Sequence, residues 1–204
     1  MASTRPTASF MLRHPARWIA LGFGSGLAPR APGTVGTLWA WVAFLVLSRW
    51  LDTAAWGVVI ALSLPIGWWA CTRTAQQLGI ADPGAIVWDE VVAFWLVLWL
   101  LMPASMAMQF AAFGLFRFFD AAKPGPVGWS DRLCKLQPGQ AIGWWQGFGI
   151  LFDDLVAAGC TLLVIALGVT LWTWRASSRW CWLWPMRCAR AAGAWLRPRV
   201  APAV

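Results

Sequence analysis

Five long apolar stretches dominate this 204-residue chain. Most of them hold close to, or slightly fewer than, the ~20 residues that a helix needs to cross the hydrocarbon of a bilayer. The stretches cover residues 34–51, 54–71, 85–102, 104–119 and 151–174. This pattern predicts an all-α, multi-helix integral membrane protein with four or five hydrophobic helices, some of them partly interfacial or tilted little.

The composition excludes an ordinary soluble domain, because 60% of the residues are hydrophobic and only 12% are charged. The formal net charge is +8, but the basic residues are scattered among the apolar runs and fall mostly in the two ends and the connecting loops. Arginine and lysine in loops suit anionic lipid head groups and set membrane topology. We therefore expect the lipid bilayer and no nucleic acid as a partner, and the sequence implies no protein partner.

Composition also divides the chain into three regions. We predict a basic N-terminal extension at 1–17, a membrane domain at 18–171, and a C-terminal tail rich in tryptophan and arginine at 172–204. The apolar run at 18–23 is too short for a cleaved export signal. The tail is either a basic amphipathic segment at the membrane interface or sequence that is not native-like.

The connections between the apolar stretches alternate in length. Those at 51–53 and 102–103 are tiny turns, whereas those at 72–83 and 120–149 are longer and polar. If the first four stretches cross in turn, the N-terminal segment and both longer loops share one side, which the positive-inside tendency makes cytoplasmic. The arginines of the tail do not fit an odd number of spans, so either one segment does not cross, or the tail lies along the membrane or is not native-like.

Six of the eight acidic residues lie in three short polar islands beside these stretches. Charges at the edge of hydrocarbon are costly, so those that persist there usually line a polar interior and do chemistry or transport. The islands hold Asp89 and Glu90, Asp120 and Asp131, and Asp153 and Asp154. This placement points to a functional site rather than to a purely structural membrane protein.

A segment rich in glycine and proline, GFGSGLAPRAPGTVGT at 22–37, precedes the first long stretch. Glycine lets backbone N–H groups approach a ligand, and Thr34 or Thr37 can cap the helix that follows, so the segment suits an anion such as phosphate. It is not a P-loop, because the GK[ST] element is missing. The alternative is an ordinary loop that leads into a helix.

Charged residues recur every three positions in FRFFDAAKP at 116–124. Residues at this spacing share one helix face, so Arg117, Asp120 and Lys123 are predicted to lie together. The pattern suits a site in which Asp120 holds a metal ion while Arg117 and Lys123 hold substrate oxygens. The alternative is an intrahelical ladder of salt bridges.

Two pairs of adjacent acids remain. Asp153 and Asp154 repel each other unless a cation lies between them, and Mg²⁺ explains the pair best because it binds carboxylates while keeping water and phosphate in its other positions. Asp89 and Glu90 point about 100° apart on a helix, so both can face only a cleft that wraps the helix end. Otherwise they are acids favoured at a helix N-terminus.

Four motifs in this order, GFGSGLAPRAPGTVGT, WDEVVAFW, FRFFDAAKPGPV and GFGILFDDLVAAG, resemble those of the bacterial phosphatidylglycerophosphatase A family over 18–171. The resemblance implies an all-helical, Mg²⁺-dependent lipid phosphatase of the inner membrane that makes phosphatidylglycerol from phosphatidylglycerol phosphate. The topology predicted from the basic loops places its site on the cytoplasmic side. It implies that the metal and catalytic carboxylates are Asp89, Glu90, Asp120, Asp153 and Asp154, and that the phosphate contacts are Ser25, Thr34, Arg117 and Lys123.

Two features depart from the family pattern. The linker RLCKLQPGQAIGWWQ at 132–146 is longer than usual, with Gln146 where glycine is expected, and the tail beyond Trp172 has no family counterpart. The alternative function is a small membrane cation transporter or channel that uses the acidic cluster. It predicts acids spread through the membrane depth and a repeat relating two halves of the chain, and the sequence has neither. A non-catalytic lipid-binding scaffold would tolerate neutralisation of all five carboxylates.

Overall fold

The computed structural model describes residues 5–133 and 141–195, and it describes side chains as far as residue 175. The described backbone is all-helical, which confirms the all-α part of the prediction. It divides into two compact units, Met1–Leu162 and Leu163–Val204. Every side chain of the predicted site belongs to the first unit.

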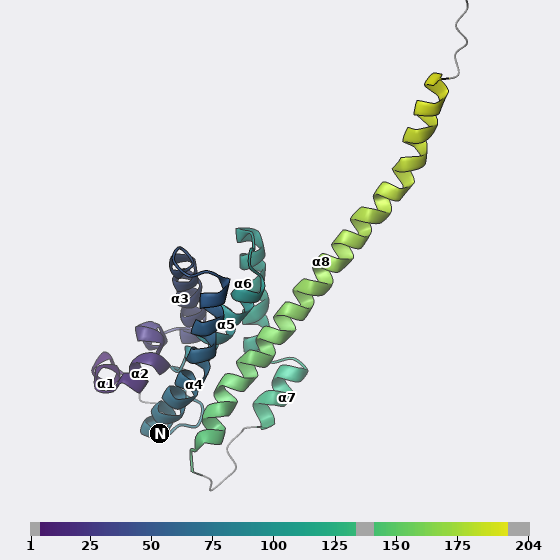
Figure 1. Ribbon diagram of the computed structural model, residues 1–204. Coiled ribbons are helices and arrows are strands. Elements are labelled where there is room, and N and C mark those ends of the chain that lie inside the picture. The colour runs from purple at the N-terminus through teal and green to yellow at the C-terminus, as the bar shows by residue number, and fades with distance from the viewer. Residues whose placement is uncertain (1–4, 134–140, 196–204) are drawn as a thin grey trace, which may run out of the picture. The chain divides into compact units, whose positions relative to one another are not determined.

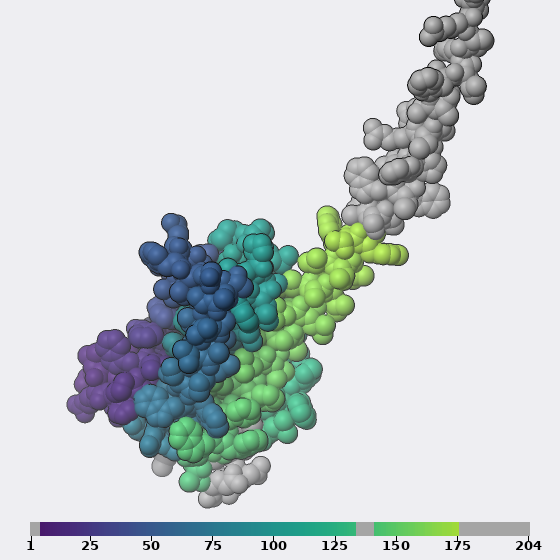
Figure 2. Space-filling model, viewed as in Figure 1, coloured from purple at the N-terminus to yellow at the C-terminus, as the bar shows by residue number. Residues whose placement is uncertain are grey.

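The described part of the chain forms eight α-helices and one 3₁₀ helix. They are α1 (Ala8–Leu12), α2 (Pro15–Ala20), η1 (Gly22–Leu27), α3 (Pro32–Leu47), α4 (Thr53–Leu78), α5 (Trp88–Leu100), α6 (Met106–Ala122), α7 (Pro126–Leu133) and α8 (Trp144–Trp195). Helix α5 contacts α3, α4 and α6 and is the central helix of the first unit (Figure 1). The N-terminal helices are purple in Figure 2. Helix α2 packs against α4 and η1, and α1 packs against α2.

Helix α5 forms the centre of the core because it is apolar on every side after its first turn. Val91, Phe94 and Leu98 are almost completely buried. The indole N–H of Trp95 donates to the backbone oxygen of Ala40 on α3 at 2.8 Å. A helix held on all sides in this way fixes the direction of the acidic side chains in its first turn.

Helix α4 is longer than the predicted stretch at 54–71. It begins at a cap, where the carboxylate of Asp52 accepts from the backbone N–H of Ala55 at 2.7 Å. It continues through the polar residues after 71 because Thr74 and Ala75 are buried, and it ends where Gly79 takes a left-handed conformation with φ +68. The predicted polar loop at 72–83 is therefore helical over its first half.

The start of α8 packs closely against the second half of α4. The indole N–H of Trp68 donates to the backbone oxygen of Trp144 at 2.7 Å. A Cβ on Gly147 would lie 2.8 Å from the Cβ of Thr72, so only glycine allows this approach. The contact holds the first part of α8, and the aspartates on it, beside the core helices.

Two described helices are long and apolar enough to cross a membrane, namely α4 and α8 from Trp144 to Arg175. Helix α3 is apolar but has 16 residues, and α5 has 13. The predicted count of four or five spans is therefore not confirmed by helix length. Of the predicted tail, the backbone is helical as far as Trp195, and the side chains after residue 175 lie outside the described residues, as do residues 134–140 of the linker.

Candidate active site

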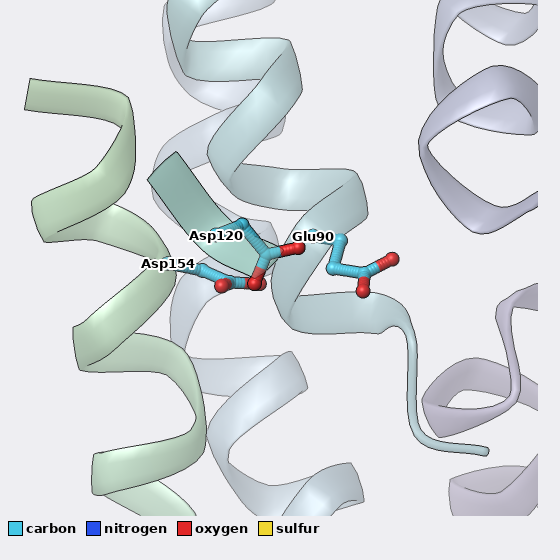
Figure 3. Close-up of side chains that lie close together, drawn as sticks. All are labelled: Glu90, Asp120 and Asp154. Atoms are coloured by element: carbon cyan, nitrogen blue, oxygen red, sulfur yellow. The ribbon is translucent and has the colours of Figure 1, made fainter. Parts of the chain in front are cut away.

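Three of the five predicted carboxylates come together from three different helices. Glu90 is in the first turn of α5, Asp120 is near the end of α6, and Asp154 is in the first part of α8 (Figure 3). One carboxylate oxygen from each lies within 4.8 Å of the other two. The Asp154 side chain reaches this group from a residue that is only 3% exposed. We name these three residues the carboxylate cluster.

Glycine on α3 makes room for one member of the carboxylate cluster. A Cβ on Gly33 would lie 2.7 Å from the Cδ of Glu90, and a Cβ on Gly36 would lie 3.3 Å from its Oε2. Both distances are shorter than ordinary van der Waals contact. The glycines of the segment at 22–37 thus let the Glu90 carboxylate lie directly against the first turns of α3.

Arg117 on α6 joins two members of the carboxylate cluster. Its Nη1 lies 3.1 Å from Oε1 of Glu90 and also forms an ion pair with Asp120, three residues along the same helix. The same nitrogen donates to Oγ1 of Thr37 at 3.4 Å. Arg117 therefore does more than form an intrahelical salt bridge, because it connects α6 to α5 and α3.

Lys123 does not continue the predicted face of Arg117 and Asp120. Helix α6 ends at Ala122, and Lys123 follows in a left-handed conformation with φ +44. Its Nζ donates to Oδ1 of Asp131 on α7 at 2.6 Å and to Oδ2 of Asp153 on α8. Burial alone would lower the pKa of Lys123, but these hydrogen bonds outweigh it and raise the pKa above its ordinary value.

Asp153 and Asp154 therefore have different surroundings, although they are neighbours in the sequence. Adjacent helical residues point about 100° apart, and this angle directs Asp153 toward Lys123 and Asp154 toward Glu90 and Asp120. Asp153 was predicted to be a metal ligand, and the structure places it outside the carboxylate cluster. Asp131, which received no role from the sequence, shares the same lysine.

Three buried carboxylate oxygens have no hydrogen-bond partner among the described residues. They are Oδ1 of Asp89, Oε2 of Glu90 and Oδ2 of Asp154. The charge of Asp89 acts on both Glu90 and Asp154, so it belongs to the same electrostatic site. An unpaired buried carboxylate is strongly unfavourable, and a bound cation is the usual compensation.

The composition of the site fits a hard divalent cation. All donors are carboxylate oxygens, which are the ligands that Mg²⁺ prefers in proteins. The negative charge exceeds the positive charge, because six carboxylates surround two cationic side chains. The six are Asp89, Glu90, Asp120, Asp131, Asp153 and Asp154, and the two are Arg117 and Lys123.

Two predicted phosphate contacts lie in other surroundings. The Oγ of Ser25 donates to the backbone oxygen of Gly22 at 2.8 Å within η1, and Thr34 is exposed on the first turn of α3. The threonine that contacts Arg117 is Thr37, which is completely buried and donates to the oxygen of Gly33 at 2.9 Å. The sequence offered both threonines as helix caps and contained no signal that would choose Thr37.

Comparison with known proteins gives consistent matches over most of the chain. The sequence model of one protein family, described as phosphatidylglycerophosphatase A, matches residues 18–169. Phosphatidylglycerophosphatase A of Haemophilus influenzae is 36% identical over 165 residues, which cover 81% of this chain and 95% of that protein. Phosphatidylglycerophosphatase A of Escherichia coli is 36% identical over 158 residues, covering 78% and 83%. No solved structure matches the chain.

Proposed function

The chain belongs to the phosphatidylglycerophosphatase A family, and on that premise we propose that it is a lipid phosphatase that hydrolyses phosphatidylglycerol phosphate to phosphatidylglycerol and inorganic phosphate. The observation that supports this most directly is the carboxylate cluster, where oxygen atoms of Glu90 and Asp154 have no hydrogen-bond partner in the part of the chain that the structure describes. Such a group suits phosphomonoester hydrolysis assisted by a metal ion. The proposed reaction is a step in the biosynthesis of a glycerophospholipid.

We further propose that the cofactor is Mg²⁺ and that Glu90, Asp120 and Asp154 hold it, with Asp89 as the neighbouring carboxylate able to complete the set. When bound, the ion supplies Lewis-acid polarisation of the phosphate and a more acidic water. Asp153, the fifth predicted carboxylate, serves in this proposal as the counterion that fixes Lys123.

Arg117 is the group best placed to bind a phosphate oxygen. All of its described contacts are made by Nη1, so the N–H donors of Nη2 are available to a second acceptor. The guanidinium carries its charge at any physiological pH and binds phosphate with directional hydrogen bonds. It would offset negative charge that develops on the phosphoryl oxygens.

Lys123 is the second cation of the proposed phosphate site. Its ammonium has three donors, and Asp131 and Asp153 accept two of them. The side chain is 30% exposed, so the remaining donor can reach an anion that approaches from outside. Ser25 and Thr34, in the segment at 22–37, remain predicted phosphate contacts.

We propose a multi-pass protein of the bacterial inner membrane, with four or five hydrophobic helices and the site facing the cytoplasm. The support is that α5 begins and α6 ends at the carboxylate cluster, while the short turns after α3 and α5 lie at the opposite ends of their helices.

A cation transporter or channel is less well supported. The acids gather in one place rather than along a path through the helices, and Arg117 and Lys123 already neutralise part of their charge. Permeant cations need binding that is weak enough for release. A buried group of carboxylates from three helices instead favours one tightly held ion.

The experiment is phosphate release from phosphatidylglycerol phosphate by the purified protein in detergent micelles, with Mg²⁺ and with a chelator. We expect release that depends on Mg²⁺ and is abolished by Asp154→Asn. Asp52→Asn is the matched control, because Asp52 is an exposed helix cap at the turn between α3 and α4. Cation flux in vesicles without any phosphate release would overturn the proposal.

A further inference from the structure

An open apolar groove of about 700 Å³ lies between α3, α4 and α5, outside the carboxylate cluster. Its volume is within the range of about 300 to 1,000 Å³ that is typical of ligand pockets. The side chains that line it are aliphatic or aromatic except for Ser63. A groove of this kind cannot bind a phosphate or a glycerol head group, but it can hold a hydrocarbon chain.

The two tryptophans of the groove that lie on α5, Trp88 and Trp95, use their indole N–H groups in hydrogen bonds to neighbouring helices. The indole N–H of Trp88 donates to the backbone oxygen of Ser63 at 3.3 Å, and that of Trp95 donates to the backbone oxygen of Ala40 at 2.8 Å. The hydrogen-bonding capacity of both rings is therefore used within the helices. The part of each indole that lines the groove is therefore apolar.

Phe23 lies at one end of the groove in a strained conformation. Its φ is +55, a value that is unfavourable for any residue with a Cβ, yet its side chain is 49% exposed. The ring stacks on Trp39 with 5.5 Å between centroids and meets Trp88 edge-on at 6.0 Å. These aromatic contacts stabilise the unfavourable backbone conformation, and the three rings together line this end of the groove.

The same end of the groove is close to the carboxylate cluster. Trp88 immediately precedes Asp89 and Glu90 on α5. On α3, Gly36 faces Glu90, and Trp39 follows one helical turn later, a rise of about 5 Å. From Trp39 to Leu47, the lining residues of α3 extend for about 12 Å in the direction away from the cluster.

The open side of the groove faces a region suited to hydrocarbon. One wall is α4, which is long and apolar enough to cross a membrane. The rim residues Val42, Val46 and Ile66 are 55%, 49% and 44% exposed, respectively, although all are aliphatic. An alkyl chain can therefore enter from the side while the polar end of the same molecule stays at the level of the cluster.

From these observations we infer that the groove holds one acyl chain of the phospholipid whose phosphate is bound at the carboxylate cluster. The inference rests on the proposed phosphatase function. Lipid tails are as apolar as the groove, so transfer of a chain from the bilayer adds little affinity. The groove acts instead by positioning, because a chain fixed beside Trp39 and Trp88 fixes the distance of the phosphate from Glu90.

The test compares two substrates in the same mixed detergent micelles, dioleoyl and dihexanoyl phosphatidylglycerol phosphate. The variant Ala43→Trp fills the floor of the groove, and Leu45→Trp, on the same helix outside the groove, is the matched control. We expect Ala43→Trp to lower kcat/KM about tenfold or more for the dioleoyl lipid, because a displaced chain moves the phosphate, and to leave the dihexanoyl lipid nearly unaffected. Leu45→Trp should leave both values unchanged.

The outcomes separate this inference from the proposed function. Release of phosphate from neither lipid by the wild-type protein would refute the phosphatase itself. If the wild-type protein hydrolyses both lipids and Ala43→Trp lowers both rates equally, the same two lipids are tested with Val42→Trp, a milder variant at the rim of the groove. An unchanged ratio of long-chain to short-chain kcat/KM in Val42→Trp would overturn the groove as an acyl-chain site, since retained short-chain activity shows that the variant is folded.

Discussion

Arg117 on α6 and Glu90 on α5 form an ion pair between helices, with 3.1 Å separating Nη1 and Oε1. The same guanidinium pairs with Asp120, so one cation holds two carboxylates whose oxygens also face Asp154. The side chains of Glu90 and Asp120 are only 12% exposed, and water therefore screens their repulsion poorly. Arg117 both reduces this repulsion and orients the two carboxylates toward a common point.

We predict that Arg117→Lys lowers the rate of phosphate release about 100-fold, an effect typical of the loss of one group that stabilises oxyanion charge. Lysine keeps the charge but lacks the planar fork of the guanidinium, so it cannot hold the two carboxylates through one nitrogen while a second nitrogen is directed at a phosphate oxygen. The measurement is kcat on phosphatidylglycerol phosphate, with circular dichroism to verify helix content. Arg49→Lys, an exposed change in the turn after α3, is the control. Equal activity of both variants would show that Arg117 does not contribute to phosphate release.

We predict that Mg²⁺ stabilises the wild-type protein against thermal unfolding and that Asp154→Asn abolishes this stabilisation. A ligand that binds only the folded state raises the free energy of unfolding, by about 2.7 kcal/mol at 100 times its dissociation constant. In chelator, Asp154→Asn should be as stable as the wild-type protein or more stable, because it removes a buried charge whose Oδ2 has no partner among the described residues. The measurement is Tm in chelator and across a Mg²⁺ series. A Mg²⁺-induced rise in Tm that persists in Asp154→Asn would exclude this residue as a ligand.

We predict the opposite behaviour for Asp153→Asn. The substitution weakens the ion pair with Lys123 and should lower the free energy of unfolding by about 1 to 3 kcal/mol in chelator, as for other hydrogen bonds to charged groups. The Mg²⁺-induced rise in Tm should remain, because Asp153 lies outside the carboxylate cluster. Asp131→Asn, which affects the same lysine from α7, should behave in the same way. If Asp153→Asn instead removes the response to Mg²⁺, both aspartates bind the ion.

The two aspartates also show how far sequence reasoning reaches. Their adjacency between apolar residues predicted a cation between them. Asp153 pairs with Lys123, whereas Asp154 lies beside Glu90 and Asp120, and the metal ion stays a prediction. Which partner each one meets depends on the rotation of α8 about its axis, and this rotation is set by packing at Gly147 against Thr72. Spacing within one helix cannot supply that information.

The spacing at 116–124 was informative only within the helix that it describes. Arg117 and Asp120 both lie inside α6, and their predicted pairing is confirmed. Lys123 follows the end of the helix, and its left-handed backbone turns it toward α7 and α8. Pro124 accounts for the end of the helix, but the direction of the residue before it depends on tertiary contacts.

The number of membrane spans could not be obtained from hydropathy for a related reason. Helix α5 is strongly apolar, yet it has only 13 residues and most of its apolar side chains are buried by other helices. Apolar stretches buried by protein and those exposed to lipid look alike in a sequence. The general architecture was therefore predictable, whereas the exposure of each helix was not.

We predict that Gly33→Ala lowers phosphate release about 10-fold to 100-fold. Elsewhere in a helix this change is favourable by up to about 1 kcal/mol, because alanine is the better helix former. Here the new Cβ would lie 2.7 Å from the Cδ of Glu90, so the carboxylate must move away from Asp120 and Asp154 or α3 must move away from α5. A displacement of about 1 Å is enough to produce such a loss of rate.

Gly114→Ala on α6 is the matched control, because its Cβ would meet nothing within 4 Å, and it should keep full activity with an equal or higher Tm. Full activity in both variants would show that the approach of Glu90 to α3 does not matter for the reaction, whereas a loss confined to Gly33→Ala ties catalysis to the position of this one carboxylate.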